Sequence, residues 1–445
     1  MKKNTTKSKN LNRINSNVAG IDIGASSIFV CIEPDNKPRI VREFPTFTVD
    51  LKRMITWLQE NNVQSVAMES TGVYWIPIFD LLDENNLKPL LVNAYHLKTV
   101  PGRKTDVKDC EWIYQLHSYG LLNGSFRPDH ETVELRTYVR QRTKLIELSS
   151  TQINLMHKAL AQMNVQLHQV ISDLAGTTGM EIIRAIIGGE RNPVNLAKLR
   201  NFRCHKSEEI IAKALEGNFR MELVFQLKQS VETYDFLQSK IIECEKEIAR
   251  VLNFINQKQG NATRVLPKLK KKNKNSFSID IKQDLINRVG VDITEIPGIS
   301  ENTAVKVLAE IGADMSKCQT SKHFASWLGL CPNNKISGGK ILSSKSRSSS
   351  NRAAQALRFA ANALHKSKTA IGSFFRRKRI GLGTPKAIVA TAHKLAITIY
   401  NMISKQQSFQ DVGQAVYEQK YQERKLSAIR KSAKEMGYEL VVKSA

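Results

Sequence analysis

The sequence lacks the features that define several large protein classes. It has no apolar run of 18 residues or more, and its basic start, MKKNTTKSKN, is not followed by an apolar segment. We therefore expect no membrane span and no secretion signal. The six cysteines form no C-x-x-C pair and have no histidine nearby at zinc-finger spacing. These absences predict a cytoplasmic protein with reduced thiols and no structural zinc.

Acidic residues are missing from one long stretch. No Asp or Glu occurs between Asp314 and Asp411, whereas 17 Lys and Arg fall between Lys317 and Lys405. The 445-residue chain carries 67 Lys and Arg against 41 Asp and Glu, a formal net charge of +26. A solvated surface normally mixes both signs. This distribution therefore predicts a nucleic-acid partner whose binding depends steeply on salt.

What the chain does contain is, first, an α/β pattern. Residues 1–17 are basic and polar, and we expect a disordered arm there. Three short β-rich runs follow, VAGIDIG, SSIFVCIE and PRIVREFP, and then helix-like and strand-like segments alternate as far as KPLLVNA. A three-strand meander followed by alternating helices and strands predicts a ribonuclease H-like α/β domain over residues 18–128.

Residues 129–265 show helical periodicity. Apolar residues step by three and four along two stripes, one with Ile153, Met156, Leu160, Met163, Leu167, Val170 and Leu174, the other with Tyr234, Leu237, Ile241, Cys244, Ile248, Val251 and Ile255. This spacing predicts two coiled-coil seams. Each seam needs a partner, either the other seam in an antiparallel hairpin or the same seam of another subunit. A homo-oligomer, a dimer or tetramer, is expected.

The remaining sequence predicts an all-α C-terminal part. A basic linker is expected over residues 266–285, around LPKLKKKNKN. The segment LINRVGVDITEIPGISENTAVKVLAEIG resembles a helix-hairpin-helix whose turn suits a phosphate, although any αα-corner can use Pro-Gly. Further helices are expected around RAAQALRFAANAL and PKAIVATAHKLAITIYNMI. We expect this domain over residues 286–410 and a tail of mixed charge over 411–445.

Four carboxylates stand where the predicted α/β topology would bring them together. Asp22 lies on the first strand, Glu69 ends the fourth, and Asp106 and Asp109 share one face at a helix start. Taken singly, each is explained as well by a turn cap, a solvated strand end or an N-terminal helix cap. On this topology the set predicts hard oxygen ligands for two Mg²⁺ or Mn²⁺ ions.

Neighbouring residues fit such a site. Gly24, next to the first strand, leaves room for a ligand to approach the backbone. Arg103 and Lys104 precede the helix and would hold phosphates beside the metal ions.

At these motifs the chain resembles the bacterial insertion-sequence transposases that join a DEDD, RuvC-like domain to a C-terminal serine domain, a family that includes the Piv-type DNA invertases. The matching segments are IDIG, AMESTGVYW, GRKTDVKDCEWI, IPGIS, AEIG, ASWLGLCPNNKISGGK and KAIVATAHKLA. The resemblance implies a recombinase that excises and inserts its own element, acting on element-end and target DNA. It also implies an element-encoded guide RNA, and active sites composed of RuvC-like and serine domains from different subunits.

The resemblance places the family's nucleophilic serine on Ser337, in ISGGK. It implies attack on a DNA phosphate and a phosphoserine linkage that conserves bond energy for religation. Gly338 and Gly339 leave the serine uncrowded, and Lys335 and Lys340 add positive charge for the transition state. The acid-free segment supplies no base, so activation is expected from the carboxylate site.

Alternatives remain open from the residues alone. A Ser-Gly-Gly surface turn also explains Ser337, and the serines of the following loop compete with it, namely Ser343, Ser344, Ser346, Ser348, Ser349 and Ser350. Lys345, Arg347 and Arg352 are expected to contact nucleic acid. Two other functions are consistent with the sequence. One is a RuvC-like metal-dependent nuclease or Holliday-junction resolvase without a role for Ser337, and the other is a non-catalytic nucleic-acid-binding protein.

Overall fold

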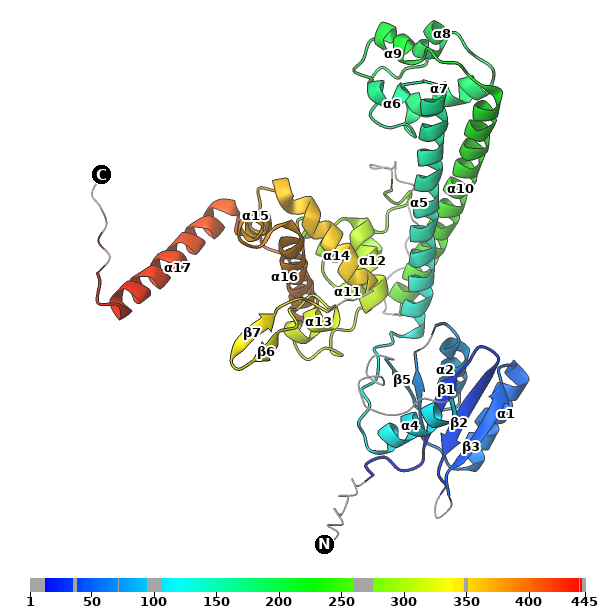
Figure 1. The fold of residues 1–445 in the computed structure, drawn as a ribbon, viewed down its shortest axis with the longest axis vertical. Coiled ribbons are helices and arrows are strands. Elements are labelled where there is room, and N and C mark those ends of the chain that lie inside the picture. The colour runs from blue at the N-terminus through cyan, green and yellow to red at the C-terminus, as the bar shows by residue number, and fades with distance from the viewer. Residues whose placement is uncertain are drawn as a thin grey trace, which may run out of the picture. The chain divides into compact units, whose positions relative to one another are not determined.

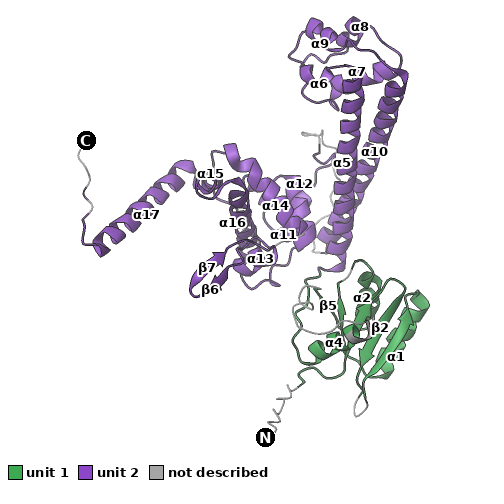
Figure 2. Ribbon diagram, in the orientation of Figure 1, with its two compact units in different colours: residues 1–127 green, residues 128–445 purple. Residues whose placement is uncertain are grey.

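The chain divides into two compact units, residues 1–127 and residues 128–445 (Figure 2). The first is an α/β unit and the second is almost entirely helical (Figure 1). This confirms the predicted α/β part and a mostly helical remainder. The expectation of an all-α C-terminal part is corrected, because a two-stranded hairpin occurs over residues 335–343. The structure, a computed structural model, describes residues 13–34, 38–70, 72–93, 106–258, 275–347, 351–439 and 441, without the side chains of 106–108. Within these ranges, no helix has both the length and the apolar character that crossing a bilayer requires.

A five-stranded mixed sheet forms the centre of the first unit. β1 (Val18–Ile23), β2 (Ser27–Ile32) and β3 (Ile40–Pro45) make the predicted antiparallel meander. β4 (Ser65–Glu69) pairs in parallel with β1, and β5 (Pro89–Val92) pairs in parallel with β4. The order across the sheet is therefore β3-β2-β1-β4-β5. α1 (Thr48–Glu60) precedes β4 and α2 (Trp75–Glu84) connects β4 to β5, as the sequence pattern predicts.

The two faces of the sheet are covered by different helices. On one face, Ala19, Ile21 and Met68 pack with apolar residues of α1 and α2. On the other face, Val18 and Ala67 pack against α4 (Asp106–Ser118). Because side chains alternate along a strand, every second residue of β1 after Val18 lies on the α4 face.

Residues 13–17 are ordered, which corrects the N-terminal arm expected over residues 1–17. The backbone amides of Ile14 and Asn15 donate to the carbonyl of Ser118 at 2.9 and 3.0 Å. The side chain of Asn15 donates to the carbonyl of His117 at 2.8 Å. These bonds satisfy carbonyls at the end of α4 that have no partner within the helix. Residues 1–12 lie outside the described residues.

A helical hairpin begins the second unit. α5 (His130–Gln162) and α10 (Met221–Lys258) lie side by side (Figure 1). They run antiparallel, because Gln238 donates to Ser149 at 2.9 Å while Glu245, later in α10, pairs with Arg142, earlier in α5. The second predicted seam is confirmed as a stripe of α10 in which every residue except the half-buried Cys244 is buried. Its partner within the chain is α5.

The first predicted seam is wrong beyond Met163. α5 ends at Gln162, and Asn164 has a left-handed φ of 58°, which does not continue a right-handed helix. The chain then forms a small helical tip with its own core, which buries Met156, Leu160, Met163, Leu167 and Leu174 of that seam. The tip consists of α6 (Leu167–Val170), α7 (Thr177–Ile187), α8 (Pro193–Lys198) and α9 (Glu208–Ala214).

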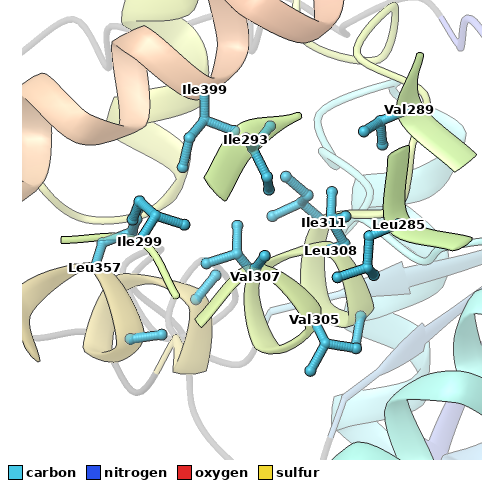
Figure 3. Close-up of a cluster of buried hydrophobic side chains, with 14 of the residues drawn as sticks. Leu285, Val289, Ile293, Ile299, Val305, Val307, Leu308, Ile311, Leu357 and Ile399 are labelled. Atoms are coloured by element: carbon cyan, nitrogen blue, oxygen red, sulfur yellow. The ribbon is translucent and has the colours of Figure 1, made fainter. Parts of the chain in front are cut away.

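The C-terminal helices enclose the largest hydrophobic cluster (Figure 3). Figure 3 shows Val305 and Leu308 of α12 among side chains of α11, α14 and α16. Leu135 of α5 and Ile248 of α10 belong to the same cluster. The base of the hairpin and the C-terminal helices therefore share one core. The helices are α11 (Lys282–Val289), α12 (Glu301–Ile311), α13 (Ser321–Trp327), α14 (Arg352–Ala363), α15 (Ala370–Leu382), α16 (Thr384–Lys405) and α17 (Gln414–Glu435).

Part of the predicted linker over 266–285 belongs to this core. Phe277 and Ile281 are buried, and α11 begins at Lys282. The lysine-rich part of the predicted linker, residues 266–274, lies outside the described residues. Apolar residues at 277 and 281 explain why the chain packs where the lysine run ends.

The segment that resembles a helix-hairpin-helix consists of α11, a short 3₁₀ turn over Ile293–Glu295, and α12. Gly298 adopts a φ of 87°, and Ser300 caps α12 by accepting a hydrogen bond from the backbone amide of Thr303 at 3.3 Å. A Cβ atom at Gly298 would lie 2.9 Å from the carbonyl oxygen of Ala360 in α14. The Pro-Gly turn thus positions α12 against α14. Phosphate binding at this turn stays a prediction.

Candidate active site

The ends of β1 and β4 bring two predicted site residues together. Ile21 is paired with Met68 in the parallel register, so Asp22 and Glu69 follow as the next positions on neighbouring strands. Residues that are paired across strands lie on the same face, and alternation places both carboxylates on the α4 face. Each of the two residues is half-buried. The structure therefore places Asp22 and Glu69 next to each other at one edge of the sheet.

α4 approaches this edge very closely because of Gly20. A Cβ atom at Gly20 would lie 2.2 Å from the backbone nitrogen of Tyr114 and 2.5 Å from the carbonyl oxygen of Cys110. Only glycine allows helix and strand to come this near. The residue before this contact on α4 is Asp109, which is half-buried. Sequence analysis missed the role of Gly20, which spacing alone does not reveal.

The N-terminal turn of α4 carries the other predicted acid. Asp106 is the first residue of the helix, and its side chain lies outside the described residues. Asp109 stands four residues before Ile113, which is buried against the sheet. Residues four apart share a helix face, so Asp109 belongs to the sheet-facing side of α4. Arg103 and Lys104 lie outside the described residues.

The donor set suits a hard divalent cation, because carboxylate oxygens are the ligands that Mg²⁺ and Mn²⁺ prefer. Among the described side chains, which exclude that of Asp106, no group of three or more His, Cys, Asp or Glu residues is close enough to hold a metal ion. The described part of the site therefore consists of the Asp22 and Glu69 edge and the α4 turn that faces it. The four-carboxylate metal site stays a prediction.

Gly24 has a local structural role that was not expected. Its backbone amide donates to the carbonyl of Ser27 at 3.0 Å, and a Cβ atom would lie 2.8 Å from that same oxygen. The glycine is therefore required by the tight turn between β1 and β2. This turn explains Gly24 without a ligand.

Ser337 lies at the tip of a hairpin that the sequence analysis did not predict. β6 (Lys335–Ser337) pairs with β7 (Lys340–Ser343), and Ser337 is directly opposite Lys340. Gly338 and Gly339 form the two-residue turn with φ of 54° and 75°. Two successive positive φ values are characteristic of a type I′ turn, which explains the Gly-Gly pair. A Cβ atom at either glycine would contact nothing within 4 Å, so the space beside Ser337 is open.

The hairpin is exposed, basic and partly apolar. Lys335, Ser337, Lys340, Lys345 and Arg347 are all exposed. Ile336, Ile341 and Leu342 are also 62 to 70% exposed. An isolated two-stranded hairpin is only marginally stable in water. Its exposed apolar side chains therefore favour an environment provided by a binding partner.

The ionisable side chains of the hairpin are all cationic. Lys and Arg are the only ionisable residue types from position 333 to position 347. These side chains can stabilise negative charge on a phosphate, but the hairpin contains no carboxylate or imidazole that could act as a general base toward Ser337. Arg352 stands apart from the hairpin, on the first turn of α14, and is also exposed.

Other cations of the acid-free stretch are held over aromatic rings. Arg377 on α15 lies 3.9 Å from the ring centre of Tyr421 and 5.0 Å from that of Tyr417, both on α17. Lys394 on α16 lies 5.1 Å from the Tyr417 ring, and burial together with the charge of Arg377 lowers its pKa. These cation–π contacts attach α17 to the helices before it.

Comparison with known proteins finds two transposase models that match separate ranges of the chain. A DEDD transposase model of the IS110 group, described as "Transposase", matches residues 19–165. A second model, described as "Transposase IS116/IS110/IS902 family", matches residues 292–375. The first range contains all four predicted carboxylates, and the second contains the β6–β7 hairpin with Ser337. A comparison with curated proteins gave no match.

Proposed function

Because the chain is a DNA transposase with the two domains of the IS116/IS110/IS902 family, we propose that it moves its element by a phosphoserine route, with Ser337 as the nucleophile. The observation that carries the proposal is the position of Ser337 at an open type I′ turn, with Lys335 and Lys340 on the strands beside it. Such a tip can enter a groove of DNA and present a hydroxyl to a backbone phosphate. The N-terminal unit is proposed to be RuvC-like, which its strand order supports.

The bond changes are those of a transesterification. The Oγ atom of Ser337 forms a bond to phosphorus, the bond from phosphorus to one deoxyribose oxygen breaks, and the serine proton ends on the released hydroxyl. Lys335 and Lys340 stabilise the added negative charge of the pentacovalent transition state. Reversal by another deoxyribose hydroxyl rejoins the DNA and frees Ser337, so no ATP is needed.

The carboxylates of the first unit are proposed to complete the active site. Asp22, Glu69, Asp106 and Asp109 would hold Mg²⁺ or Mn²⁺. A bound divalent ion would supply Lewis-acid stabilisation of phosphate charge and lower the pKa of an attacking group. The parallel pairing of β1 with β4 supports this assignment, because it fixes Asp22 and Glu69 as neighbours before any ligand binds.

Guide RNA and oligomerisation belong to the same proposal. The 17 cations of the acid-free stretch support binding to a polyanion without base specificity. An element-encoded RNA would then select the target and donor DNA by base pairing. A dimer or tetramer would bring the RuvC-like unit of one subunit to the serine hairpin of another.

One experiment tests the nucleophile. The protein is incubated with Mg²⁺, element-end DNA and RNA transcribed from the noncoding flank of the element, and denaturing gels then detect protein linked covalently to DNA. We expect an adduct that peptide mapping locates at Ser337 and that Ser337→Ala abolishes. Ser344→Ala is the matched control, because it alters a neighbouring serine that is also exposed. An adduct that persists in Ser337→Ala excludes Ser337, and cleaved DNA without any adduct favours the RuvC-like nuclease.

A second comparison tests the carboxylates. Asp22→Asn preserves the shape of the side chain and removes its charge, so we expect nucleic-acid binding to persist while strand exchange is lost. If strand exchange proceeds at the wild-type rate in Asp22→Asn, the acids are structural. The same reaction without RNA tests whether an RNA guides the protein. If recombination proceeds equally well without RNA, the guide RNA is not part of the mechanism.

A further inference from the structure

A groove between α5, α12 and α14 has a cavity volume of about 1030 Å³. Of the predicted site residues, Arg352 alone lines it. Its α5 wall includes Arg140, Lys144 and Glu147, and its α12 wall includes Lys306 and Glu310. The groove is therefore a feature of the second unit that is separate from the serine hairpin.

The walls of the groove are fixed to each other. Arg136 of α5 donates to the carbonyl oxygens of Ala309 and Glu310, at 3.1 and 2.8 Å, where α12 ends. Arg140 forms two parallel hydrogen bonds of 2.8 Å with the carboxylate of Glu310. Bidentate pairs of this kind hold their partners in one orientation. The groove is thus preformed, which lowers the entropic cost of binding.

The acids of the groove are already engaged by other cations. Glu310 pairs with Arg136 and Arg140, and Glu147 lies 3.7 Å from Lys144. In the described part of the chain, no carboxylate forms an ion pair with Lys306 or Arg352. Two cations consequently face the groove without a direct ion pair.

Lys306 is unusual because it is also half-buried. Burial lowers its pKa, and the nearby charge of Arg142 lowers it further, whereas Glu147 acts in the opposite direction. A cation that is removed from water without a partner destabilises the protein. An anion that enters the groove would relieve that cost, so Lys306 favours a phosphate there.

An exposed aromatic ring completes the groove. Phe359 on α14 is 79% exposed. It stands seven residues after Arg352, and Gln355 and Ala356 lie between them on the same helix face. An exposed aromatic ring next to cations without ion pairs is typical of a site for single-stranded nucleic acid. Bases stack on the ring, and Lys and Arg bind the phosphate backbone.

We propose that this groove binds an unpaired strand of nucleic acid, with backbone phosphate at Lys306 and Arg352 and a base stacked on Phe359. The proposal rests on the proposed function, because a transposase must bind nucleic acid. The groove contact is additional to the serine chemistry, and no step of that chemistry requires it. A duplex is the less favoured occupant, because its bases are already stacked on each other and cannot cover Phe359.

Lys306→Met tests the phosphate contact, with a fluorescein-labelled single-stranded oligonucleotide as the probe and fluorescence anisotropy as the measurement. We expect binding to weaken about ten- to a hundredfold and the slope of log affinity against log salt to fall by about 1. Thermal unfolding without nucleic acid should show an unchanged or raised Tm, because the variant removes a half-buried charge that has no direct ion pair. Lys246→Met on α10 is the matched control, since Lys246 is exposed and outside the groove.

The results for these variants distinguish a role of Lys306 in nucleic-acid binding from a role in folding. Unchanged affinity and unchanged salt slope in Lys306→Met overturn the phosphate contact. A lowered Tm with the salt slope of the wild type also overturns it, because it shows that Lys306 acts only in folding. Phe359→Ala should weaken binding of the single-stranded probe several-fold more than binding of a duplex. Equal weakening of both probes overturns the assignment of an unpaired strand.

Failure of this inference is distinguishable from failure of the proposed function. Asp22→Asn should lose strand exchange but bind the single-stranded probe as the wild type does, whereas Lys306→Met should lose affinity. If Lys306→Met binds normally and Asp22→Asn loses strand exchange, the groove is overturned and the transposase chemistry stands. If the wild-type protein binds no nucleic acid, both are overturned.

Discussion

Arg142 on α5 and Glu245 on α10 form an ion pair of 2.7 Å in which the side chains are only 2% and 0% exposed. Glu245 also accepts the backbone amide of Ser278 at 2.8 Å, and Arg142 donates to the carbonyl of Asn275 at 3.0 Å. The guanidinium lies 3.9 Å from the ring centre of Phe277. This pair therefore joins the two hairpin helices to residues 275–278, which precede α11.

Removal of Arg142 should destabilise the second unit strongly. Arg142→Leu leaves the Glu245 carboxylate buried without its counter-ion, and we expect a loss of about 3–5 kcal/mol in the free energy of unfolding. Urea unfolding followed by circular dichroism measures it. Arg184→Leu is the control, because Arg184 and Asp235 form an exposed pair worth about 1 kcal/mol or less. Equal losses in the two variants would show that burial of the Arg142 pair contributes nothing.

A paired substitution isolates the charge. Leucine at both Arg142 and Glu245 removes the buried charges together, so the double variant should be more stable than Arg142→Leu alone. A double variant that is less stable than the single one would mean that the hydrogen bonds of Glu245 to Ser278 dominate.

Gly20→Ala should separate α4 from the sheet. The added Cβ atom would lie 2.2 Å from a backbone nitrogen, which cannot give way as a flexible side chain can. We expect a loss of about 3 kcal/mol or more in the first unit, together with loss of strand exchange because the α4 acids shift relative to Asp22. Gly381→Ala in α15 is the opposite case, since its Cβ atom would meet nothing within 4 Å and alanine favours a helix. It should leave the Tm unchanged or raise it.

The first unit should lose stability as the pH falls below neutrality, because His117 is buried. Its Nε2 atom is 2.9 Å from the hydroxyl of Ser65, and the Ser65 hydroxyl donates to the carbonyl of Lys88 at 3.1 Å. Nε2 therefore donates to Ser65, and burial lowers the pKa of the ring. Below about pH 6.5 the unfolded chain takes up this proton before the folded unit does, so the free energy of unfolding decreases with falling pH.

Unfolding of the first unit by denaturant at a series of pH values measures that slope. His117→Gln removes the titrating group, and we expect it to flatten the pH dependence between about pH 6.5 and 5.5. His157→Gln, at an exposed position of α5, is the control and should leave the slope as it is. A slope that is identical in the wild type and in His117→Gln contradicts the assignment.

The turn beside Ser337 should tolerate only residues that accept a left-handed backbone. Gly338→Asn fits, because asparagine followed by glycine is a preferred type I′ pair, and we expect adduct formation close to wild type. Gly338→Val places a β-branched residue at a φ of 54° and should reduce adduct formation at least tenfold. The Tm should stay the same in both variants, because nothing packs on the turn. A fully active Gly338→Val variant would show that the hairpin is not needed in this form.

The α/β unit was the most predictable part of the chain. Its strands have strong periodicity and clear turn residues, so the meander and the position of Glu69 at the end of β4 followed from local sequence. The proximity of Asp22 to Glu69 depends on the pairing of β1 with β4. That pairing was predicted from the expected topology of the domain and not from local sequence. Gly20 was not predictable, because its role lies in a contact with α4 more than eighty residues later.

Tertiary contacts explain the errors in the helical unit. The apolar steps from Ile153 to Leu174 match a heptad repeat, yet α5 ends at Gln162, Asn164 has a left-handed φ, and most of the same residues fill a compact core. The β6–β7 hairpin was not predicted, because Gly338 and Gly339 were taken only as residues that leave room beside Ser337. Their ability to adopt positive φ, which a type I′ hairpin turn requires, was not considered. The groove at Lys306 combines three helices distant in sequence, and no single segment signals it.

The shared core of the hairpin and the C-terminal helices has a consequence for synthesis of the protein. Residues 13–127 can fold as soon as they leave the ribosome, because their sheet needs no later segment. Leu135 of α5, by contrast, must wait for α16, which supplies Ile399 to the same cluster near the end of the chain. During translation the apolar base of the hairpin therefore remains only partly covered until α16 has been made. A nascent chain stalled before α16 would be a natural substrate for chaperones.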